Sequence, residues 1–537
     1  MAPKGSPGSS GQGREGGTER HWWTLLAVCG ATFMLLVDIT IVQVALPTMQ
    51  RSLHATFSDL QWVISAYALS LAALILTQGA LADKFGRKRI FVFGLAVFTL
   101  ASAACGLSHT PAELIASRAV QGVGGAAMFA TSLALIGQDF QGKARSSAIA
   151  VWGATVGGAV AIGPLVGGAL TSAFGWQWIF YVNVPVGVLT LLVSMRMVNV
   201  ADPNAGRLDW NGLLTFSGGL FLLVLGLTRG NDDGWSSRKV VVTLSAAVLL
   251  LVLFVIVELL QKRPMFDLSL FRKPSFTGVS VATFCIGAGM FALLPYLTLY
   301  LQNDLGLSPL QGGERLLPLT TLSFLVPLLS RPVTERVPAG LALCVGLATS
   351  AVGIWLFTGL TVGSSWRALL PGLLVSGVGV GLANPAIAKI ALGVVPPQRA
   401  GMASGISNTF RIGGVATGVA ALGAVFQHRL QSTLHGLVGA HLAPGLARAV
   451  AAGGTAAAAR ASGGQPTVVA AAHHAFVNGI DEVVWVGAVT VAVGAAFAAL
   501  VRRKDFYSRR RQGYRPPAAP PLPPPPLERD LVPEAVG

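Results

Sequence analysis

The chain has 537 residues, of which 53% are hydrophobic and 11% are charged. Soluble globular domains carry about 25% charged residues, so this composition excludes a large soluble enzyme, a disordered chain and a fibrous repeat. A polytopic membrane protein fits, because its lipid-facing surface needs no charge. In a membrane protein, the net charge of +16 mainly indicates which loops face the cytoplasm. It does not indicate nucleic-acid binding, because a nucleic-acid-binding protein would need a polar fold to display this charge.

Apolar runs of about 20 residues, the length that crosses a bilayer as a helix, recur along the chain and predict an all-α membrane protein. We expect fourteen spans, at residues 22–46, 60–80, 90–108, 111–138, 146–170, 178–198, 211–229, 239–260, 275–301, 312–330, 340–360, 366–388, 401–427 and 481–501. With both tails in the cytoplasm, the six inner loops hold 15 Lys and Arg residues, and the seven outer loops hold 7 when Arg229 and Lys239 at the adjoining span ends are included. This is the positive-inside pattern, which supports the count and the orientation.

Three segments lie outside the expected spans. Residues 1–21 are rich in Gly and Ser and are predicted to be a disordered tail. Residues 427–480 are predicted to be the one long outer loop. Residues 502–537 begin basic and become proline-rich, which favours a cytoplasmic tail that contacts anionic lipid, with a specific PxxP partner as the alternative.

Three charged residues fall inside the expected spans, away from their ends. Asp38 is predicted to lie about 13 Å below the outer end of the first span, and Arg118 about 10 Å below the outer end of the fourth, at 1.5 Å per residue. Their similar depth indicates either a static ion pair or a proton-coupling pair. Arg411 lies near mid-membrane, where it either binds substrate or braces its helix. Because charges at such depth are costly, we expect all three to be functional.

Four motifs accompany these charges. The loop after the second span contains Gly79, Asp83, Gly86, Arg87 and Lys88 within the run GALADKFGRKR. The others are Leu36 to Pro47 around Asp38, with Gln43; Arg118 to Ala126, with Gln121; and Gly163-Pro164-Leu-Val-Gly167-Gly168.

Together these motifs resemble those of the major facilitator superfamily, specifically its fourteen-helix drug:proton antiporter branch, over residues 22–501. The resemblance implies a six-helix bundle at 22–200, two inserted helices at 201–262 and a second six-helix bundle at 263–501. It implies that Asp38 and Arg118 take part in proton coupling. It further implies that the Gly163 to Gly168 motif marks export, although small residues also serve ordinary helix packing.

The resemblance assigns the first motif a mechanical role. Its glycines permit a tight turn, and Asp83 is expected to face the positive end of the helix at 401–427, latching the two halves in one conformation. Residues near mid-membrane form the expected substrate cavity; they are Gln43, Gln121, Asn408 and Arg411.

We therefore predict a monomeric, multi-pass protein of the bacterial cytoplasmic membrane that is not an enzyme and needs no cofactor. Its expected partners are protons, membrane lipids and a hydrophobic small molecule. Neutral or weakly acidic aromatic compounds are the favoured substrates. The hypothesis is proton-coupled efflux of antibiotics or other drugs. The alternatives are proton-coupled uptake of a metabolite and a non-transporting membrane sensor.

Overall fold

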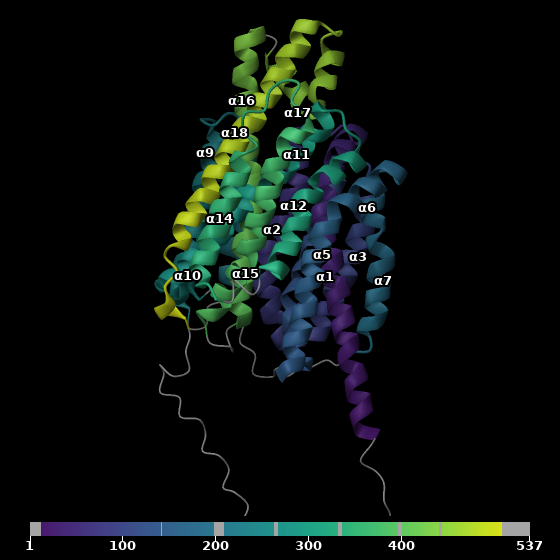
Figure 1. The fold of residues 1–537 in the computed structure, drawn as a ribbon, viewed down its shortest axis with the longest axis vertical. Helices are drawn as coiled ribbons and strands as arrows, with labels where there is room; N and C mark the ends of the chain where they lie inside the picture. The colour runs from purple at the N-terminus through teal and green to yellow at the C-terminus, as the bar shows by residue number, and fades with distance from the viewer. Residues whose placement is uncertain are drawn as a thin grey trace, which may run out of the picture.

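The computed structural model describes residues 12–140, 142–197, 209–261, 267–330, 336–395, 400–439 and 443–506. Its main elements are helices, nearly all of them aligned along the long axis (Figure 1). In the N-terminal half they are α1 Gln12–Ser52, α2 Phe57–Phe85, α3 Arg87–Gly106, α4 Pro111–Asp139, α5 Gly142–Phe174, α6 Trp178–Tyr181 and α7 Asn183–Ser194. The next pair is α8 Trp210–Asp233 and α9 Arg238–Leu260.

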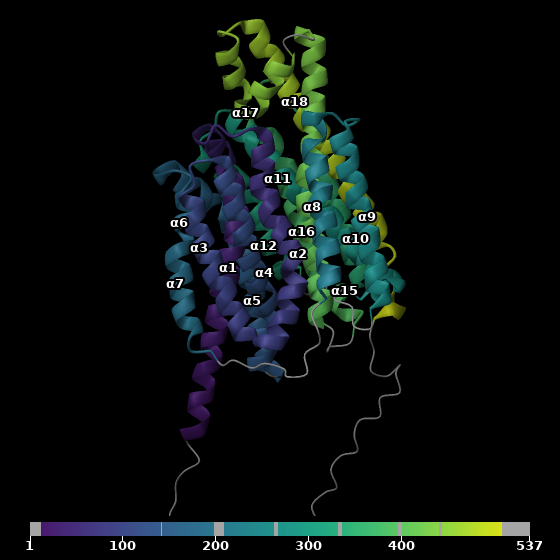
Figure 2. The ribbon, with the colours of Figure 1, turned by 180° about the vertical axis from the view of Figure 1, so that it is seen from behind.

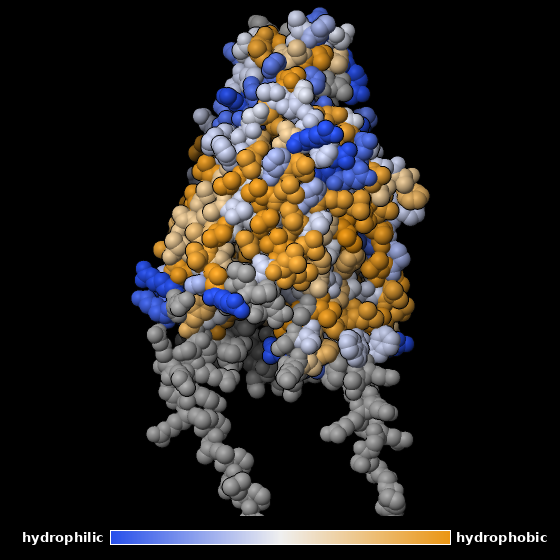
Figure 3. Space-filling model, viewed as in Figure 1, coloured by the Kyte–Doolittle hydropathy of each residue, from blue (hydrophilic) through white to orange (hydrophobic). Residues whose placement is uncertain are grey.

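The C-terminal half contains α10 Pro274–Ile286, α11 Ala292–Leu299, α12 Pro309–Leu329, α14 Ala339–Trp355, α15 Leu370–Gly393, α16 Ala400–Val438, α17 Ala443–Ala461 and α18 Pro466–Ala498. Eleven helical stretches of the described chain are long and apolar enough to cross a membrane, and two apolar helices, Trp178–Ser194 and Ala339–Trp355, are shorter. Apolar side chains form a broad band around the middle of the molecule, with polar groups toward both ends (Figure 3). The chain is therefore a multi-pass membrane protein.

The two ends of the bundle differ. Parts of α16, α17 and α18 project beyond the apolar band at one end, which we call the hairpin end (Figure 1). The first and last described residues lie at the opposite end, which we call the tail end. The prediction of a long loop at 427–480 is therefore wrong. Helix α16 continues to Val438, and α17 and the start of α18 are helical as well. Alanine, the best helix former, dominates α17.

The first helix also begins earlier than expected. The prediction of a disordered tail over 1–21 fails from Gln12 onward, where α1 starts; residues 1–11 lie outside the described chain. The expected basic tail is described only to residue 506.

Prolines interrupt two of the expected spans. In the stretch predicted at 178–198, α6 ends at Tyr181, four residues before Pro185, whose missing N–H removes the bond to that carbonyl. In the stretch predicted at 275–301, a π-helical turn at Gly287–Phe291 separates α10 from α11 and ends four residues before Pro295. A π-helical turn lengthens the spacing of the backbone hydrogen bonds and so accommodates the bond that proline cannot make.

The inserted pair α8 and α9 covers the boundary between the two halves. Ala68, Leu69 and Ala72 of α2, Leu220 and Val224 of α8, and Ala416 and Ala420 of α16 form one buried apolar cluster. Figure 2 shows α8 beside α2 and α16 on this side of the molecule. Through α8, the inserted pair therefore packs over the α2–α16 boundary.

Candidate functional site

Asp38 of α1 and Arg118 of α4 form an ion pair inside the N-terminal half. The Arg118 NH1 atom lies 2.5 Å from Asp38 Oδ2. Asp38 is 0% exposed and Arg118 is 2% exposed. The structure thus brings together the two charges that were expected at similar depth.

Neutral amides complete the coordination of the Asp38 carboxylate. Gln121 Nε2 donates to Asp38 Oδ1 at 2.9 Å, and Asn183 Nδ2 donates to the same oxygen at 3.3 Å. Arg118 NH1 also donates to Gln121 Oε1 at 2.7 Å. Asn183 in turn donates to Ser102 Oγ at 3.0 Å, and Ser102 donates to the Phe180 carbonyl. We call Asp38, Arg118, Gln121, Asn183 and Ser102 the acid–arginine network.

Aromatic rings cover the arginine. The Arg118 guanidinium lies 4.2 Å from the Tyr67 ring centroid and 5.8 Å from that of Phe180, a cation–π arrangement. Its Nε donates to the Val63 carbonyl at 3.3 Å. Both charges are therefore enclosed by protein, and removal of one partner of such a buried pair costs about 3–5 kcal/mol.

Two members of this region differ from the expectations. Gln121 was expected in the substrate cavity, but it is 0% exposed and belongs to the network. Its position three residues after Arg118 places both on one face of α4. Asn183 and Tyr67 were not predicted as site residues, although a polar Asn within an apolar span is a signal that marks Asn183.

The motif in α5 contacts both halves of the molecule. A Cβ added at Gly167 would lie 2.7 Å from Ile41 Cγ1 of α1, and one at Gly163 would meet the Thr40 side chain. On the other side, a Cβ at Gly168 would lie 2.6 Å from the Pro309 carbonyl oxygen of α12. These glycines allow α5 to approach α1 within its own half and α12 across the boundary.

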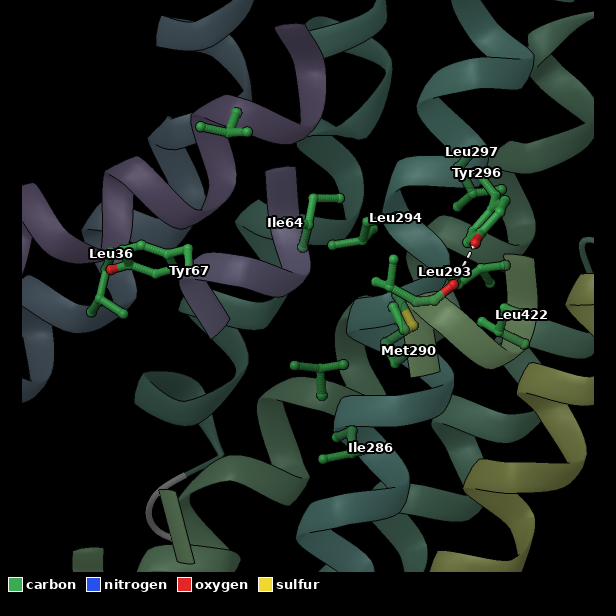
Figure 4. Close-up of a cluster of buried hydrophobic side chains, with 14 of the residues drawn as sticks. Leu36, Ile64, Tyr67, Ile286, Met290, Leu293, Leu294, Tyr296, Leu297 and Leu422 are labelled. Atoms are coloured by element: carbon green, nitrogen blue, oxygen red, sulfur yellow. Dashed lines mark hydrogen bonds between the residues drawn. The ribbon is translucent and has the colours of Figure 1, made fainter. Parts of the chain in front are cut away.

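Hydrogen bonds join the two halves at the hairpin end. Gln302 Nε2 donates to the Val44 carbonyl of α1 at 2.7 Å. Gln61 Nε2 of α2 donates to the Val419 carbonyl of α16 at 2.9 Å and to Tyr296 Oη of α11 at 3.3 Å. Within the C-terminal half, Tyr296 Oη donates to the same Val419 carbonyl at 2.7 Å. The Tyr296 bond is the dashed line in Figure 4, where Ile64 and Leu294 also lie side by side. None of these sealing residues was predicted.

The same boundary opens toward the tail end. Gln61, Ala72 and Gly79 recur along one face of α2. Gln61 bonds α16 and the Ala72 carbonyl accepts from Thr409 at 3.4 Å, but a Cβ at Gly79 would meet nothing within 4 Å. In α5, Gly157 lies against Phe324 of α12, whereas Gly153, four residues closer to the tail end, meets nothing. Among the described residues, contacts across the boundary therefore close the hairpin end and are sparse at the tail end.

This opening predicts a difference in chemical accessibility along α2. In a variant whose four native cysteines are replaced by serine, Gly79→Cys should react with a maleimide at least about tenfold faster than Ala72→Cys, because thiol reactivity follows exposure. Stopped-flow labelling of the purified protein measures both rates. Equal rates would contradict an open boundary at Gly79.

The first motif is described in part. Gly86 adopts φ +102° between α2 and α3, a conformation that favours glycine. Arg87 NH1 donates to the Ala134 carbonyl at 3.1 Å, and Lys88 Nζ donates to the Met195 carbonyl at 2.8 Å. Both bonds lie within the N-terminal half. The Asp83 side chain lies outside the described part, so its latch to α16 stays a prediction.

The remaining candidates for the substrate cavity lie on different helices, Gln43 on α1 and Asn408 and Arg411 on α16. Gln43 of α1 is 6% exposed. Asn408 and Arg411 of α16 are each half-buried, and Arg411 NH2 donates to Asn408 Oδ1 at 2.8 Å. These two residues thus form a hydrogen-bonded polar pair on α16.

The family model of the Major Facilitator Superfamily matches residues 28–419, so the chain belongs to this superfamily of membrane transporters. Multidrug resistance protein Stp of Mycobacterium tuberculosis is 36% identical over 430 residues, which cover 80% of this chain and 78% of Stp. The tetracenomycin C resistance and export protein of Streptomyces glaucescens is 31% identical over 505 residues, 90% of this chain and 92% of that protein.

A solved structure shares the fold. The bacterial homologue of the human lysosomal transporter Spinster, in its inward-facing and unoccupied conformation, aligns with a TM-score of 0.59 at 18% identity. The alignment covers 94% of this chain and 100% of that chain.

Proposed function

We propose that the protein exports antibiotics or other hydrophobic drugs across the bacterial cytoplasmic membrane in exchange for protons. The observation that carries this proposal is a fully buried acid–arginine network in a chain whose relatives are named resistance and export proteins. When a proton binds the Asp38 carboxylate, the ion pair with Arg118 is lost, and this loss links protonation to a change in helix packing.

The proposed topology has fourteen spans with both termini in the cytoplasm. Helices occupy each of the fourteen expected ranges, and the positive-inside count supports a cytoplasmic tail end. With this orientation the conformation is inward-facing, because the boundary between the halves is open at the tail end. Asp83 would then latch the tail end in the opposite, outward-facing state.

In the proposed transport cycle, the hairpin end and the tail end close in turn. Substrate enters between the halves from the cytoplasm, and the hairpin end then opens as the tail end closes around a central site. A proton from outside reaches Asp38, which releases Arg118, and the return to the inward-facing state re-forms the pair. Each proton moved across 100 mV supplies about 2.3 kcal/mol.

Proteoliposomes test the proposal. An imposed gradient of one pH unit at zero potential should accumulate a neutral substrate up to about tenfold per coupled proton, since 1.36 kcal/mol per unit is a tenfold ratio. Tetracenomycin C serves as the aromatic antibiotic probe and ethidium as a cationic probe, for which the same ratio applies because the potential is zero. Accumulation of neither, while both still bind, would contradict proton-driven export. Proton-driven movement with the opposite coupling direction would favour uptake.

A further inference from the structure

One face of α16 looks into the space between the two halves. Asn408, Arg411, Val415 and Val419 recur at spacings of three and four residues and so lie along one stripe. The Val419 carbonyl accepts from Gln61 of the N-terminal half, and Val419 lines a small cavity with Leu46 and Ile64 of that half. Arg411 lies about 12 Å from Val419 along this stripe, toward the tail end.

Neighbouring helices occupy the other faces of α16 around Arg411. Thr409 bonds the Ala72 carbonyl of α2, and a Cβ at Gly413 would lie 3.8 Å from Leu220 of α8. Gly414 lies against the backbone of Phe284 in α10. The inserted helix α8, which separates α16 from lipid on that side, therefore packs on the face opposite to Arg411. The π-helical turn at Gly287–Phe291 packs against the Arg411 backbone, since a Cβ at Gly287 would meet the Arg411 carbonyl oxygen. The half-buried Arg411 side chain therefore belongs to the part of α16 between this turn and α2, on the side of the boundary between the halves.

Arg411 is not used to brace α16. Its one hydrogen bond in the described structure runs to Asn408, on the same helix. A guanidinium carries five N–H donors in a planar fork. Arg118, by contrast, bonds Asp38, Gln121 and the Val63 carbonyl and is 2% exposed. The bracing role considered for Arg411 thus has no contact to support it.

Three carboxylates of the C-terminal half have partners other than Arg411. Asp304, at the hairpin end, lies 3.0 Å from His473 Nδ1, and Asp481 accepts from the Gly359 N–H at 2.8 Å. Asp505, at the tail end, accepts from Ser275. Among the described residues, Arg411 has no ion-pair partner. A half-buried cation at mid-membrane without a counter-charge is costly unless a ligand supplies one.

We propose that Arg411 and Asn408 bind the anionic group of the substrate, so that the preferred cargo is an organic acid carrying a carboxylate or phenolate on an apolar body. The guanidinium fork matches the two oxygens of a carboxylate, and Val415, on the same stripe, offers an apolar contact to the body. This proposal rests on the export function, since it places the substrate between the halves.

The experiment compares acids with neutral amides of the same shape. The purified protein is titrated with benzoate and benzamide, 2-naphthoate and 2-naphthamide, and 9-anthroate and 9-anthramide, and binding is measured as the rise in unfolding temperature with ligand concentration. We expect at least one acid to bind about tenfold more tightly than its amide. Arg411→Gln should remove that difference and leave amide binding unchanged, whereas Arg411→Lys should restore part of it.

Arg448→Gln is the matched control, because Arg448 is exposed on α17 and, like Arg411, donates within its own helix, to the Pro444 carbonyl at 3.3 Å. An unchanged acid preference in Arg411→Gln, or no preference for any acid in the unaltered protein, would overturn the proposal. Proton-driven export of tetracenomycin C without acid preference would leave export standing and reject the anion site. Arg411-dependent acid binding without proton-driven transport would reject the export function alone.

Discussion

Asp38→Asn should abolish accumulation driven by a pH gradient. The asparagine cannot take up a proton, so the inside-to-outside ratio in proteoliposomes should fall from about tenfold per pH unit to one. Exchange of labelled for unlabelled substrate without a gradient should persist, because it needs no net proton movement. The loss of a buried charge partner should also lower the free energy of unfolding by about 3–5 kcal/mol.

Glu113→Gln is the control for this substitution. Glu113 is a carboxyl on α4, the helix of Arg118, but it is exposed and accepts from the His109 N–H at 2.8 Å. Gradient-driven accumulation should survive in this variant. If Asp38→Asn accumulates substrate normally, proton coupling lies elsewhere. If gradient-free exchange also disappears from a folded Asp38→Asn protein, the residue serves transport as a whole and not coupling.

Gly168→Val should prevent closure of the hairpin end. Even the first carbon of the side chain would lie 2.6 Å from the Pro309 carbonyl oxygen and 2.8 Å from Leu310 Cα, and backbone atoms of α12 cannot rotate away. We expect the hairpin end to stay open and transport to fall by at least about tenfold, as a cost of about 1.4 kcal/mol on the closed state suffices for that.

A cysteine at Val44 reports this closure. Val44 is 0% exposed at the hairpin end, and its carbonyl bond to Gln302 does not depend on the side chain. Labelling by an impermeant maleimide from that side should be faster in Gly168→Val than in Gly158→Val. A Cβ at Gly158, on the same helix, would meet nothing within 4 Å. Equal labelling in the two variants would show that Gly168 does not control closure.

The ion pair between Asp38 and Arg118 was predictable from sequence because depth follows from residue count along a straight helix. The partners Gln121 and Asn183 were harder to place, since rotation of α4 and α7 about their axes decides which residues meet. Asn183 also follows the break at Tyr181, which shifts the helical phase after it.

The bonds that seal the hairpin end had no sequence signal. Gln61, Tyr296 and Gln302 are single polar residues in apolar surroundings, and their acceptors are backbone carbonyls of Val44 and Val419. Any residue carries such a carbonyl, so only the relative placement of the halves identifies the Gln61 and Gln302 pairs, and only the packing of α11 on α16 identifies the Tyr296 pair. The helical extension at the hairpin end was not predicted for another reason, because residues 427–480 are rich in Ala, Gly and His and contain no long apolar run outside the expected last span.

The enclosure of Asp38 has a consequence for the resting cell. A membrane acid that water reached from both sides would let protons cross continuously and discharge the gradient that every other transporter shares. Here the carboxylate is surrounded by Arg118, Gln121 and Asn183 and has no exposed surface. With the proposed role of Asp38 in proton coupling, a copy that rests in this conformation is therefore expected not to conduct protons through this carboxylate.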